Sequence, residues 1–367
     1  MLSIFDSLAE RVSLTVSPQV RARIGVIGAG AIVDVAHLPA YRHAGLEVVC
    51  LYDIDYDRAR ETANRHGINR VARTLDELLE TLEVEVVDIA VAPTAQPDIL
   101  RQALAAQRDV LCQKPFAPEL GVAARLIEEV EASGRTVAVN QQLRFDEGIA
   151  AARAMVDEGW LGTVLAVTFD VDIWTDWSSW PWIVNSPRLD LTYHSIHYLD
   201  AVRALVGDPV RVFCSASQSP DQATLGETRT ITTLVYPDNV RVLLHVHHNN
   251  RFGEPRARFQ IDGTAGKIKG TLGLLYEYPR GRPDTLKVWS ASLPTDGWLP
   301  YPVTTRWIPD AFIGPMRSLL NARATGGQPE TRPRENFGTL ALVEALYRSI
   351  ETGESEVPDS LDPREPA

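Results

Sequence analysis

Short apolar runs alternate with amphipathic stretches along the first 140 residues. The runs read IGVIG from Ile24, VVCLYD from Val48, VVDIAVAP from Val86, DVLCQKP from Asp109 and TVAVN from Thr136. The stretches between them, residues 57–66, 75–82, 97–106 and 118–133, are typical of helices. Strands this continuously apolar are buried on both faces, so the alternation predicts a parallel, doubly wound sheet. Its strands would end along one edge, where ligands bind.

From Asp146 onward the pattern changes. A helix is predicted at 146–158, a helical block at 190–205 and a final helix at about 335–352. Between them, apolar and polar residues alternate with a period of two at residues 164–172, 210–218, 229–236, 240–248, 256–262 and 286–289. This pattern predicts a largely antiparallel, open sheet with one buried face. The fold class is therefore α/β, with a doubly wound parallel sheet followed by an α+β domain.

These patterns divide the chain into three parts. We place an N-terminal extension at residues 1–20, the first domain at 21–143 and the second, α+β domain at 144–355. The extension is either a frayed segment or one that docks on a neighbouring subunit. The final helix could pack back on the first domain. The open face of the second sheet favours a homodimer or homotetramer.

The composition of the chain disfavours some classes of binding partner. The chain has 367 residues and a net charge of −12, which disfavours nucleic acid and anionic membranes because both need clustered positive charge. No apolar stretch approaches the roughly 18 residues of a membrane span. The three cysteines are far apart in the sequence, which fits a reducing compartment. We expect a cytoplasmic protein with a small-molecule substrate.

A glycine-rich turn follows the first predicted strand. Gly28 permits the tight turn, and Gly30 lets the backbone approach a pyrophosphate. Ala31 and Ile32 then open a helix whose N–H groups face the phosphates. The third position of this dinucleotide fingerprint is Val33 instead of Gly or Ala, so helix and strand should lie slightly further apart. The alternative is a glycine turn in an unrelated α/β protein.

An acidic residue ends the second predicted strand. Asp53 lies 20 residues beyond Val33, where a carboxylate accepts hydrogen bonds from both adenosine ribose hydroxyls and repels a 2′-phosphate. The expected cofactor is therefore NAD, with NADP disfavoured. Asp55 or Asp57 could share this role, although Asp57 could equally be a helix N-cap.

Lys114 follows the fourth predicted strand and is the first candidate for catalysis. At this edge of the sheet it would lie near the cofactor, and a neighbouring nicotinamide cation would lower its pKa. An amine of this kind suits hydrogen bonding or proton transfer at a substrate hydroxyl. The alternative is a solvated surface lysine.

A second group of candidates lies in the second domain. Tyr193 and His197 are four residues apart and would share a helix face that His194 flanks, which suits acid–base chemistry and binding of a polyol. Asp200 could orient His197. The alternative is a structural role for the histidines.

Further residues are candidates for substrate binding. Trp174 and Trp180 belong to a tryptophan-rich loop that could stack on sugar rings, or could be a packed loop or a subunit contact. Arg188 follows that loop, and Arg144 follows the last strand of the first domain. His245 and His247 would face the same way on a strand, so a metal site is conceivable, but no acidic or cysteine partner is evident. Sheet packing or a polar interface is the favoured role, and we expect no metal site. We expect His37 to be structural.

Several stretches together resemble the Gfo/Idh/MocA oxidoreductases, which are named for glucose-fructose oxidoreductase and inositol dehydrogenase. The resemblance covers most of residues 23–355 and rests on IGVIGAGAIVDVAHLPAY, the VAP turn, LCQKPFA, NQQLRF, His197 with Asp200, IDGTAGKIKG and ENFGTLALVEALYRSIETG. It implies an N-terminal Rossmann domain, an α+β second domain, and NAD(P)-dependent oxidation or reduction of a sugar, inositol or derivative.

The resemblance also implies roles for individual residues. Lys114 matches the family lysine that assists proton transfer, and His197 matches the histidine that contacts the same oxygen. Pro93, Thr94, Gln113 and Lys114 would contact the cofactor. Two positions depart from the family pattern: Gln113 stands where a glutamate is usual, and Tyr193 stands where an aspartate is usual. Tyr193 could replace that aspartate as proton donor, or Lys114 and His197 could suffice.

The leading hypothesis is therefore a dehydrogenase that acts on CH–OH groups of carbohydrate-like substrates. A first alternative is an enzyme of the same fold that recycles NAD while it cleaves or epimerises a glycoside. A second alternative is an inactive NAD-binding module for a ligand or partner protein.

Overall fold

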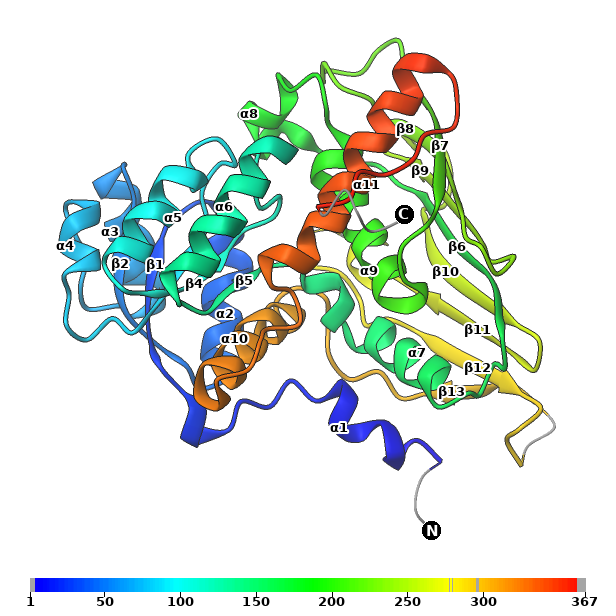
Figure 1. Cartoon of the computed structure of the whole chain (residues 1–367), viewed down its shortest axis with the longest axis horizontal. Helices are drawn as coiled ribbons and strands as arrows, with labels where there is room; N and C mark the ends of the chain where they lie inside the picture. The colour runs from blue at the N-terminus through cyan, green and yellow to red at the C-terminus, as the bar shows by residue number, and fades with distance from the viewer. Residues whose placement is uncertain (1–3, 277, 279, 295–296, 362–367) are drawn as a thin grey trace. The chain divides into compact units, whose positions relative to one another are not determined.

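Five short apolar strands form a parallel sheet. The computed structural model describes residues 4–276, 278, 280–294 and 297–361. The strand order is β2-β1-β3-β4-β5, with every pairing parallel. The bounds are Arg23–Ile27 (β1), Glu47–Tyr52 (β2), Val86–Ile89 (β3), Asp109–Cys112 (β4) and Val137–Val139 (β5); Figure 1 labels β1, β2, β4 and β5. An isolated parallel bridge from Leu51 to Val71 extends the sheet beyond β2. Counted as a strand, it gives the Rossmann order 3-2-1-4-5-6, so the predicted doubly wound sheet is confirmed.

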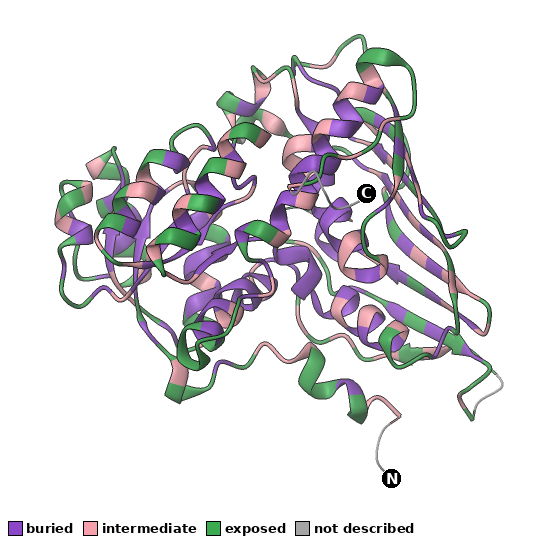
Figure 2. Ribbon diagram, viewed as in Figure 1, coloured by how far each residue is buried: buried purple, intermediate pink, exposed green. Residues whose placement is uncertain are grey.

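Helices connect and cover these strands. They are α2 (Leu38–His43), α3 (Tyr56–His66), α4 (Leu75–Leu79), α5 (Gln96–Ala105), α6 (Leu120–Ser133) and α10 (Ile313–Thr325). Helix α5 packs against β3 and β4, and α10 packs against β4 and β5. Because helices cover the sheet, its strands are buried, as the purple ribbons of Figure 2 show. A π-helical turn, Val33–His37, precedes α2.

The second sheet has eight strands in the order β13-β12-β11-β10-β6-β9-β8-β7. Among the strands that the structure describes, β6 and β9 alone pair in parallel, so the expected largely antiparallel sheet is confirmed. The bounds are Val164–Asp172 (β6), Arg211–Ser217 (β7), Arg229–Val235 (β8), Arg241–His247 (β9), Arg256–Gly263 (β10), Gly266–Thr271 (β11), Leu286–Ser290 (β12) and Leu299–Tyr301 (β13).

One face of this sheet is covered and the other is open. Helices α7 (Glu147–Asp157) and α9 (Ile196–Val206) pack against β11 and β6; the remaining helices of this unit are α1 (Ala9–Val12), α8 (Pro181–Val184) and most of α11 (Pro333–Thr352). Residues alternate between buried and exposed along β7 to β10, in agreement with the predicted period of two (Figure 2).

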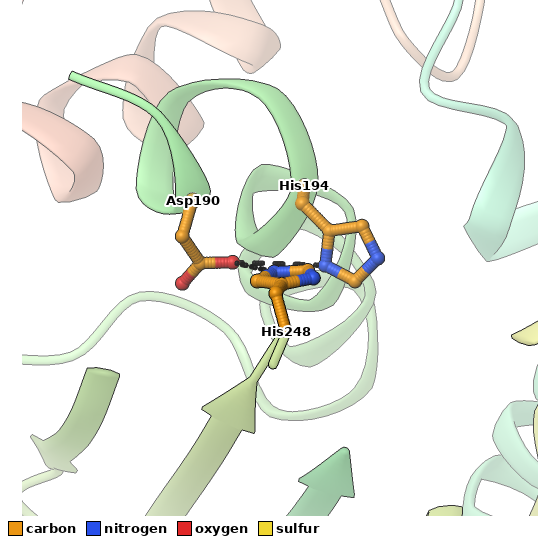
Figure 3. Close-up of side chains that lie close together, drawn as sticks. All are labelled: Asp190, His194 and His248. Carbon is orange, nitrogen blue, oxygen red and sulfur yellow. Dashed lines mark hydrogen bonds and ion pairs between the residues drawn. The ribbon is translucent and has the colours of Figure 1, made fainter. Parts of the chain in front are cut away.

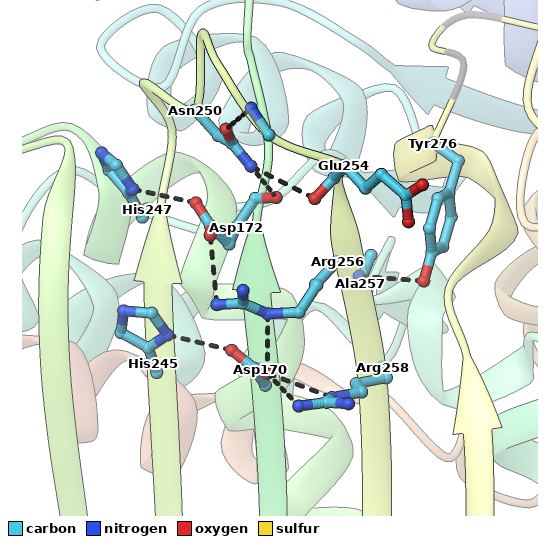
Figure 4. A network of polar contacts seen from close by, with 11 residues as sticks. Asp170, Asp172, His245, His247, Asn250, Glu254, Arg256, Ala257, Arg258 and Tyr276 are labelled. Atoms are coloured by element: carbon cyan, nitrogen blue, oxygen red, sulfur yellow. Dashed lines mark hydrogen bonds and ion pairs between the residues drawn. The ribbon is translucent and has the colours of Figure 1, made fainter.

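The outer face carries a polar network. His245 and His247 bond to Asp170 and Asp172, at 3.0 Å and 2.9 Å, and Arg256 lies between the two carboxylates (Figure 4). The premise that these histidines lack acidic partners is therefore wrong, because β6 pairs beside β9 and supplies both aspartates.

Two compact units emerge, and their limits differ from the domains expected from sequence. Residues 14–145 and 308–337 form the unit of the parallel sheet, whereas 1–13, 146–307 and 338–367 form the other. Helix α10 thus belongs with the Rossmann sheet although it follows the second sheet in sequence. Most of α11 belongs to the second unit, where Thr339 bonds to Asp200.

The N-terminal extension packs on its own chain. Leu8 is fully buried, Arg11 pairs with Asp157, and α1 lies against α7. Residues 4–12 are therefore not frayed. No helix of the described residues is long and apolar enough to cross a membrane.

Candidate active site

The glycine turn leaves β1 at the edge expected for a cofactor. Gly28 has φ +107°, and a Cβ there would lie 2.3 Å from the carbonyl oxygen of Ala90, so only glycine fits. Gly30 has open space instead, since a Cβ there would meet no atom within 4 Å. The helix begins immediately afterwards at Ala31 and Ile32. A close backbone approach and a helix N-terminus are the two features that hold a pyrophosphate.

Asp53 ends β2 beside this turn. Its carboxylate accepts hydrogen bonds from the backbone N–H of Ala29 at 2.7 Å and of Asp55 at 2.8 Å. Arg58 donates to the same group at 2.6 Å. Arg58 was not predicted as a site residue from the sequence. Its position beside Asp53 bears on the choice between NAD and NADP, because an arginine can accommodate a 2′-phosphate.

The N-cap of the helix that follows β2 is Asp55, not Asp57 as the sequence suggested. Asp55 is the N-cap of α3, and its side chain accepts from the N–H of Arg58 at 3.1 Å. Asp57 lies in the first turn and pairs with Arg60. The suggestion that Asp57 is the N-cap is therefore wrong.

Lys114 lies just beyond β4 in a loop that Gln96 holds. The amide of Gln96 donates to the carbonyl oxygens of Gln113 and Phe116 at 2.8 Å and 2.9 Å, and its oxygen accepts from the N–H of Gln113 at 2.9 Å. Burial lowers the pKa of the Lys114 amine to about 7 because the charged form is desolvated. A lysine with this pKa exchanges a proton near neutral pH.

A chain of buried polar groups orients Gln113. His37 Nδ1 lies 2.6 Å from Asp88, and His37 Nε2 lies 3.0 Å from the side-chain nitrogen of Gln113. The Gln113 amide must donate here, so the ring proton is on Nδ1. The oxygen of Gln113 accepts from the N–H of Lys114 at 2.8 Å. His37 is thus structural, as expected, but what it orients is the residue beside Lys114.

Other cofactor candidates lie at the same edge. Pro93 is buried and Thr94 exposed in the turn after β3. Neighbouring strands are linked there by backbone bonds from Ala90 to Ile27 and from Gln113 to Ile89. The structure therefore places Gly28, the VAP turn and Gln113 along one edge of the parallel sheet.

In the second unit, Tyr193 and His197 have different neighbours. Tyr193 lies in a π-helical turn, Leu191–Ser195, and packs edge-on against Trp182 with ring centroids 5.1 Å apart. His197 is on α9, almost fully buried, and packs edge-on against Trp307 at 5.4 Å. The prediction that Tyr193 and His197 share one helix face assumed an ordinary α-helix. A π-helical turn has more residues per turn, so residues four apart are no longer aligned on one face.

His194 belongs to a compact cluster with Asp190 and His248 (Figure 3). Asp190 Oδ1 lies 2.8 Å from His248 Nε2 and 3.6 Å from His194 Nδ1. Burial opposes ionisation of Asp190, but the two histidines outweigh it and hold its pKa well below the usual range. Sequence inspection did not connect His248 with His194, because 54 positions separate them.

The two candidate arginines each have acidic partners. Arg144 is almost fully buried and lies 3.3 Å from Glu335 and 3.6 Å from Glu330. Arg188 bonds to Glu344 at 2.7 Å and stacks over the ring of Tyr347. Their positive charges are largely neutralised, and contact with substrate stays a prediction for both.

The two candidate tryptophans have different neighbours. Trp174 is 52 % exposed and lies beneath Arg251. Trp180 packs against Trp177 and Tyr278.

Comparison with known families agrees with both units. A family model described as an oxidoreductase family with an NAD-binding Rossmann fold matches residues 22–141, and the GFO/IDH/MocA C-terminal domain matches residues 149–269. The chain belongs to the Gfo/Idh/MocA oxidoreductases. The resemblance drawn from sequence is confirmed, and with it the NAD-binding character of the first domain.

Several relatives have names that indicate sugar or inositol substrates. D-apiose dehydrogenase of Paraburkholderia graminis is 28 % identical and aligns over 97 % of this chain and 95 % of its own length. Inositol 2-dehydrogenase 3 of Saccharopolyspora erythraea is 24 % identical over 93 % and 96 %. A solved levoglucosan dehydrogenase in complex with NADH and L-sorbose shares the fold, with 20 % identity, a TM-score of 0.77 and coverage of 93 % and 99 %.

Proposed function

We propose that this enzyme transfers a hydride between NAD and a hydroxyl or keto carbon of a sugar, inositol or related polyol. The observation that carries the proposal is the desolvated amine of Lys114, with a pKa of about 7, beside the edge that bears Gly28 and Gln113. The long alignment with D-apiose dehydrogenase supports a carbohydrate substrate.

The turn after β1 fits NAD. We assign Gly28, Gly30, Ala31 and Ile32 to the pyrophosphate and Asp53 to the adenosine ribose; we also assign Pro93, Thr94 and Gln113 to cofactor binding. Bound NAD supplies the hydride acceptor. The carboxylate of Asp53, fixed by the N–H groups of Ala29 and Asp55, favours NAD over NADP because it repels a 2′-phosphate.

We assign proton transfer to Lys114. The neutral amine accepts the proton of a substrate hydroxyl during oxidation, and the ammonium returns it during reduction. We assign a second contact to the reacting oxygen to His197, as the family resemblance implies, and keep Tyr193 as a proton donor in place of the usual aspartate. His194, Arg144, Arg188, Trp174 and Trp180 are proposed contacts to the remainder of the substrate.

A panel of sugars and polyols tests this function directly. Purified protein with NAD should form NADH with at least one member, and Lys114→Ala should lower the rate by about 10²–10⁴-fold. Lys287→Ala is the matched control, because that lysine is exposed on β12 of the other unit. Equal rates for the two variants would remove Lys114 from the chemistry.

Two other outcomes would favour the alternatives. NAD that stays bound through purification, with glycoside cleavage and no net NADH, would indicate a recycling mechanism. NAD binding without turnover of any panel member would indicate an inactive ligand-binding module.

We further propose a cytoplasmic homodimer or homotetramer. The three cysteines, Cys50, Cys112 and Cys214, are free and buried, which fits a reducing compartment. The open face of the eight-stranded sheet is the proposed contact between copies.

A further inference from the structure

Three side chains from two separate segments of the second unit meet at one point (Figure 3). Asp190 precedes the π-helical turn, His194 lies within it, and His248 follows β9 directly. Their ligand atoms, one carboxylate oxygen and two imidazole nitrogens, all lie within 4.8 Å of one another. The substrate contact proposed for His194 does not account for its convergence with Asp190 and His248.

The two oxygens of Asp190 have separate roles. Oδ2 accepts hydrogen bonds from the hydroxyls of Ser195 at 2.8 Å and Thr230 at 2.7 Å. Oδ1 faces His248 and His194. The carboxylate is therefore fixed in orientation, and a single oxygen is presented to both imidazoles.

One separation within the cluster matches that of ligands around a single ion. Ligand atoms 2.0–2.2 Å from a tetrahedral zinc lie roughly 3.3–3.6 Å apart. The separation of 3.6 Å between Asp190 Oδ1 and His194 Nδ1 agrees with this value and exceeds a normal hydrogen bond. The 2.8 Å between Oδ1 and His248 Nε2 is shorter, so the His248 ring would move outward by about half an ångström on coordination.

Outer groups already hold the ligands, as metal sites require. His248 Nδ1 lies 2.8 Å from the hydroxyl of Thr175, which leaves Nε2 directed at Asp190. Asp190 and His248 are fully buried, whereas the His194 side chain is 14 % exposed. A partner on the second nitrogen and a buried carboxylate fix ligand geometry, and the exposed edge of His194 offers an entry path.

We propose that Asp190, His194 and His248 form a three-ligand site for a divalent transition-metal cation of the zinc class. Two imidazoles and one carboxylate are a ligand set that such ions prefer, and they leave a fourth position for water. A bound ion would join the end of β9 to the π-helical turn that carries Tyr193 and leads into α9. The site would thus fix the segment from which Tyr193 and His197 project.

Metal binding to the full-length protein tests the site without reference to activity. Protein stripped with a chelator is titrated with Co²⁺ alone, followed by its visible absorption bands, and then with Zn²⁺ as competitor. Wild type should bind one equivalent of Co²⁺, which Zn²⁺ displaces. His194→Ala should weaken binding by at least about 10-fold. Zn²⁺ should raise the Tm of wild type but not of His194→Ala.

The matched control is His245→Ala. This histidine also pairs with an aspartate, Asp170, but on the outer face of the sheet. It should bind Co²⁺ as wild type does. His194→Ala is preferred to His248→Ala because a partly exposed side chain can be removed with less risk to folding, which circular dichroism would verify.

Two results would overturn the site. One is binding far below one equivalent by folded wild-type protein, which would leave the cluster as a hydrogen-bonded histidine–aspartate group only. The other is equal Co²⁺ affinity in His194→Ala, His245→Ala and wild type, which would place the ion elsewhere.

Discussion

At the residue scale, the pH dependence of the enzyme should follow Lys114. Its pKa is lowered to about 7 by burial, so the amine is protonated below that pH and cannot accept a proton. The kcat/KM for alcohol oxidation should therefore rise as pH increases through about 7 and then level off, while ketone reduction should fall over the same range. Steady-state rates at a series of pH values measure both limbs.

Lys114→Arg is the control for this profile, because arginine stays charged over the whole range. It should lose the rising limb along with most of the rate.

The ionisation of Lys114 also affects the stability of the fold. An unfolded lysine binds its proton up to about pH 10.4, so the free energy of unfolding should increase between pH 7 and 10 on account of Lys114. A pH profile in wild type that Lys114→Arg shares would contradict the assignment.

Cofactor choice should depend on Asp53 and its neighbour Arg58. In Asp53→Ser the Arg58 guanidinium loses its nearest partner, at 2.6 Å, keeps only the longer ion pair with Asp55 at 3.7 Å, and becomes available to a 2′-phosphate. The ratio of kcat/KM for NADP to that for NAD should rise by about 10–100-fold, or about 1.4–2.7 kcal/mol. Kinetics with both cofactors give this ratio.

Asp57→Ser provides the comparison, since the Asp57 side chain is exposed and pairs with Arg60 of the same helix. Its ratio should equal that of wild type. If Asp53→Ser leaves the ratio unchanged as well, Asp53 does not select the cofactor.

The same residues show what a sequence can disclose. Gly28, Asp53 and Lys114 were identifiable because strand ends and glycine turns leave a local pattern. Gln96, Arg58 and His248 were not, because each acts through contacts that depend on the folded backbone. Arg144 and Arg188 illustrate the converse: their charge suggested ligand contacts, but their glutamate partners lie 156 or more positions away.

At the element scale, strands and helices could be predicted where the pattern of apolar and polar residues along the chain is clear. The strands of the parallel sheet are nearly uniform apolar runs, and all five were expected. Strand β11 reads GKIKGT with one large apolar residue, and α10 begins IGPM, where glycine and proline obscure the helix. Pairing of β6 with β9 in parallel could not be predicted, because register between distant strands leaves no local signal.

The loop after β4 depends on a helix side chain. The Gln96 side chain bonds to four backbone groups of residues 113–116, one N–H and three carbonyl oxygens. In Gln96→Leu the N–H of Gln113 keeps its bond to Ile89, but the buried carbonyl oxygens lose their side-chain donor, which should lower the free energy of unfolding by about 1–3 kcal/mol. The kcat/KM should fall further than stability explains, because Lys114 lies in this loop. Denaturant melts and kinetics on the same preparation test both effects.

Gln102→Leu on the same helix is the matched variant. Its side chain is exposed and bonds only to a carbonyl of its own helix, Asp98, at 3.3 Å. It should change neither quantity appreciably. Equal behaviour of the two variants would show that Gln96 does not hold the loop.

At the scale of the whole molecule, the open sheet face is the feature most in need of a partner. Phe213, Ile231 and Leu243 are 40 %, 53 % and 41 % exposed and surround Thr233 on neighbouring strands. Beside them lie the paired charges of Asp170, His245 and Arg258, which are already satisfied within the sheet (Figure 4). An apolar patch next to neutralised charges suits contact between two identical sheets.

Ile231→Asp tests this contact. A charge at this position of the patch would be buried on association beside a histidine, His245, that is already paired with Asp170, which costs several kcal/mol per copy. Wild type should elute as a dimer or tetramer by size-exclusion chromatography with light scattering, and Ile231→Asp should shift towards monomer at the same concentration. Leu82→Asp is the control, since Leu82 is 89 % exposed in the other unit and should leave assembly unchanged. A monomeric wild type, or an Ile231→Asp protein that assembles as wild type does, would exclude this face as the interface.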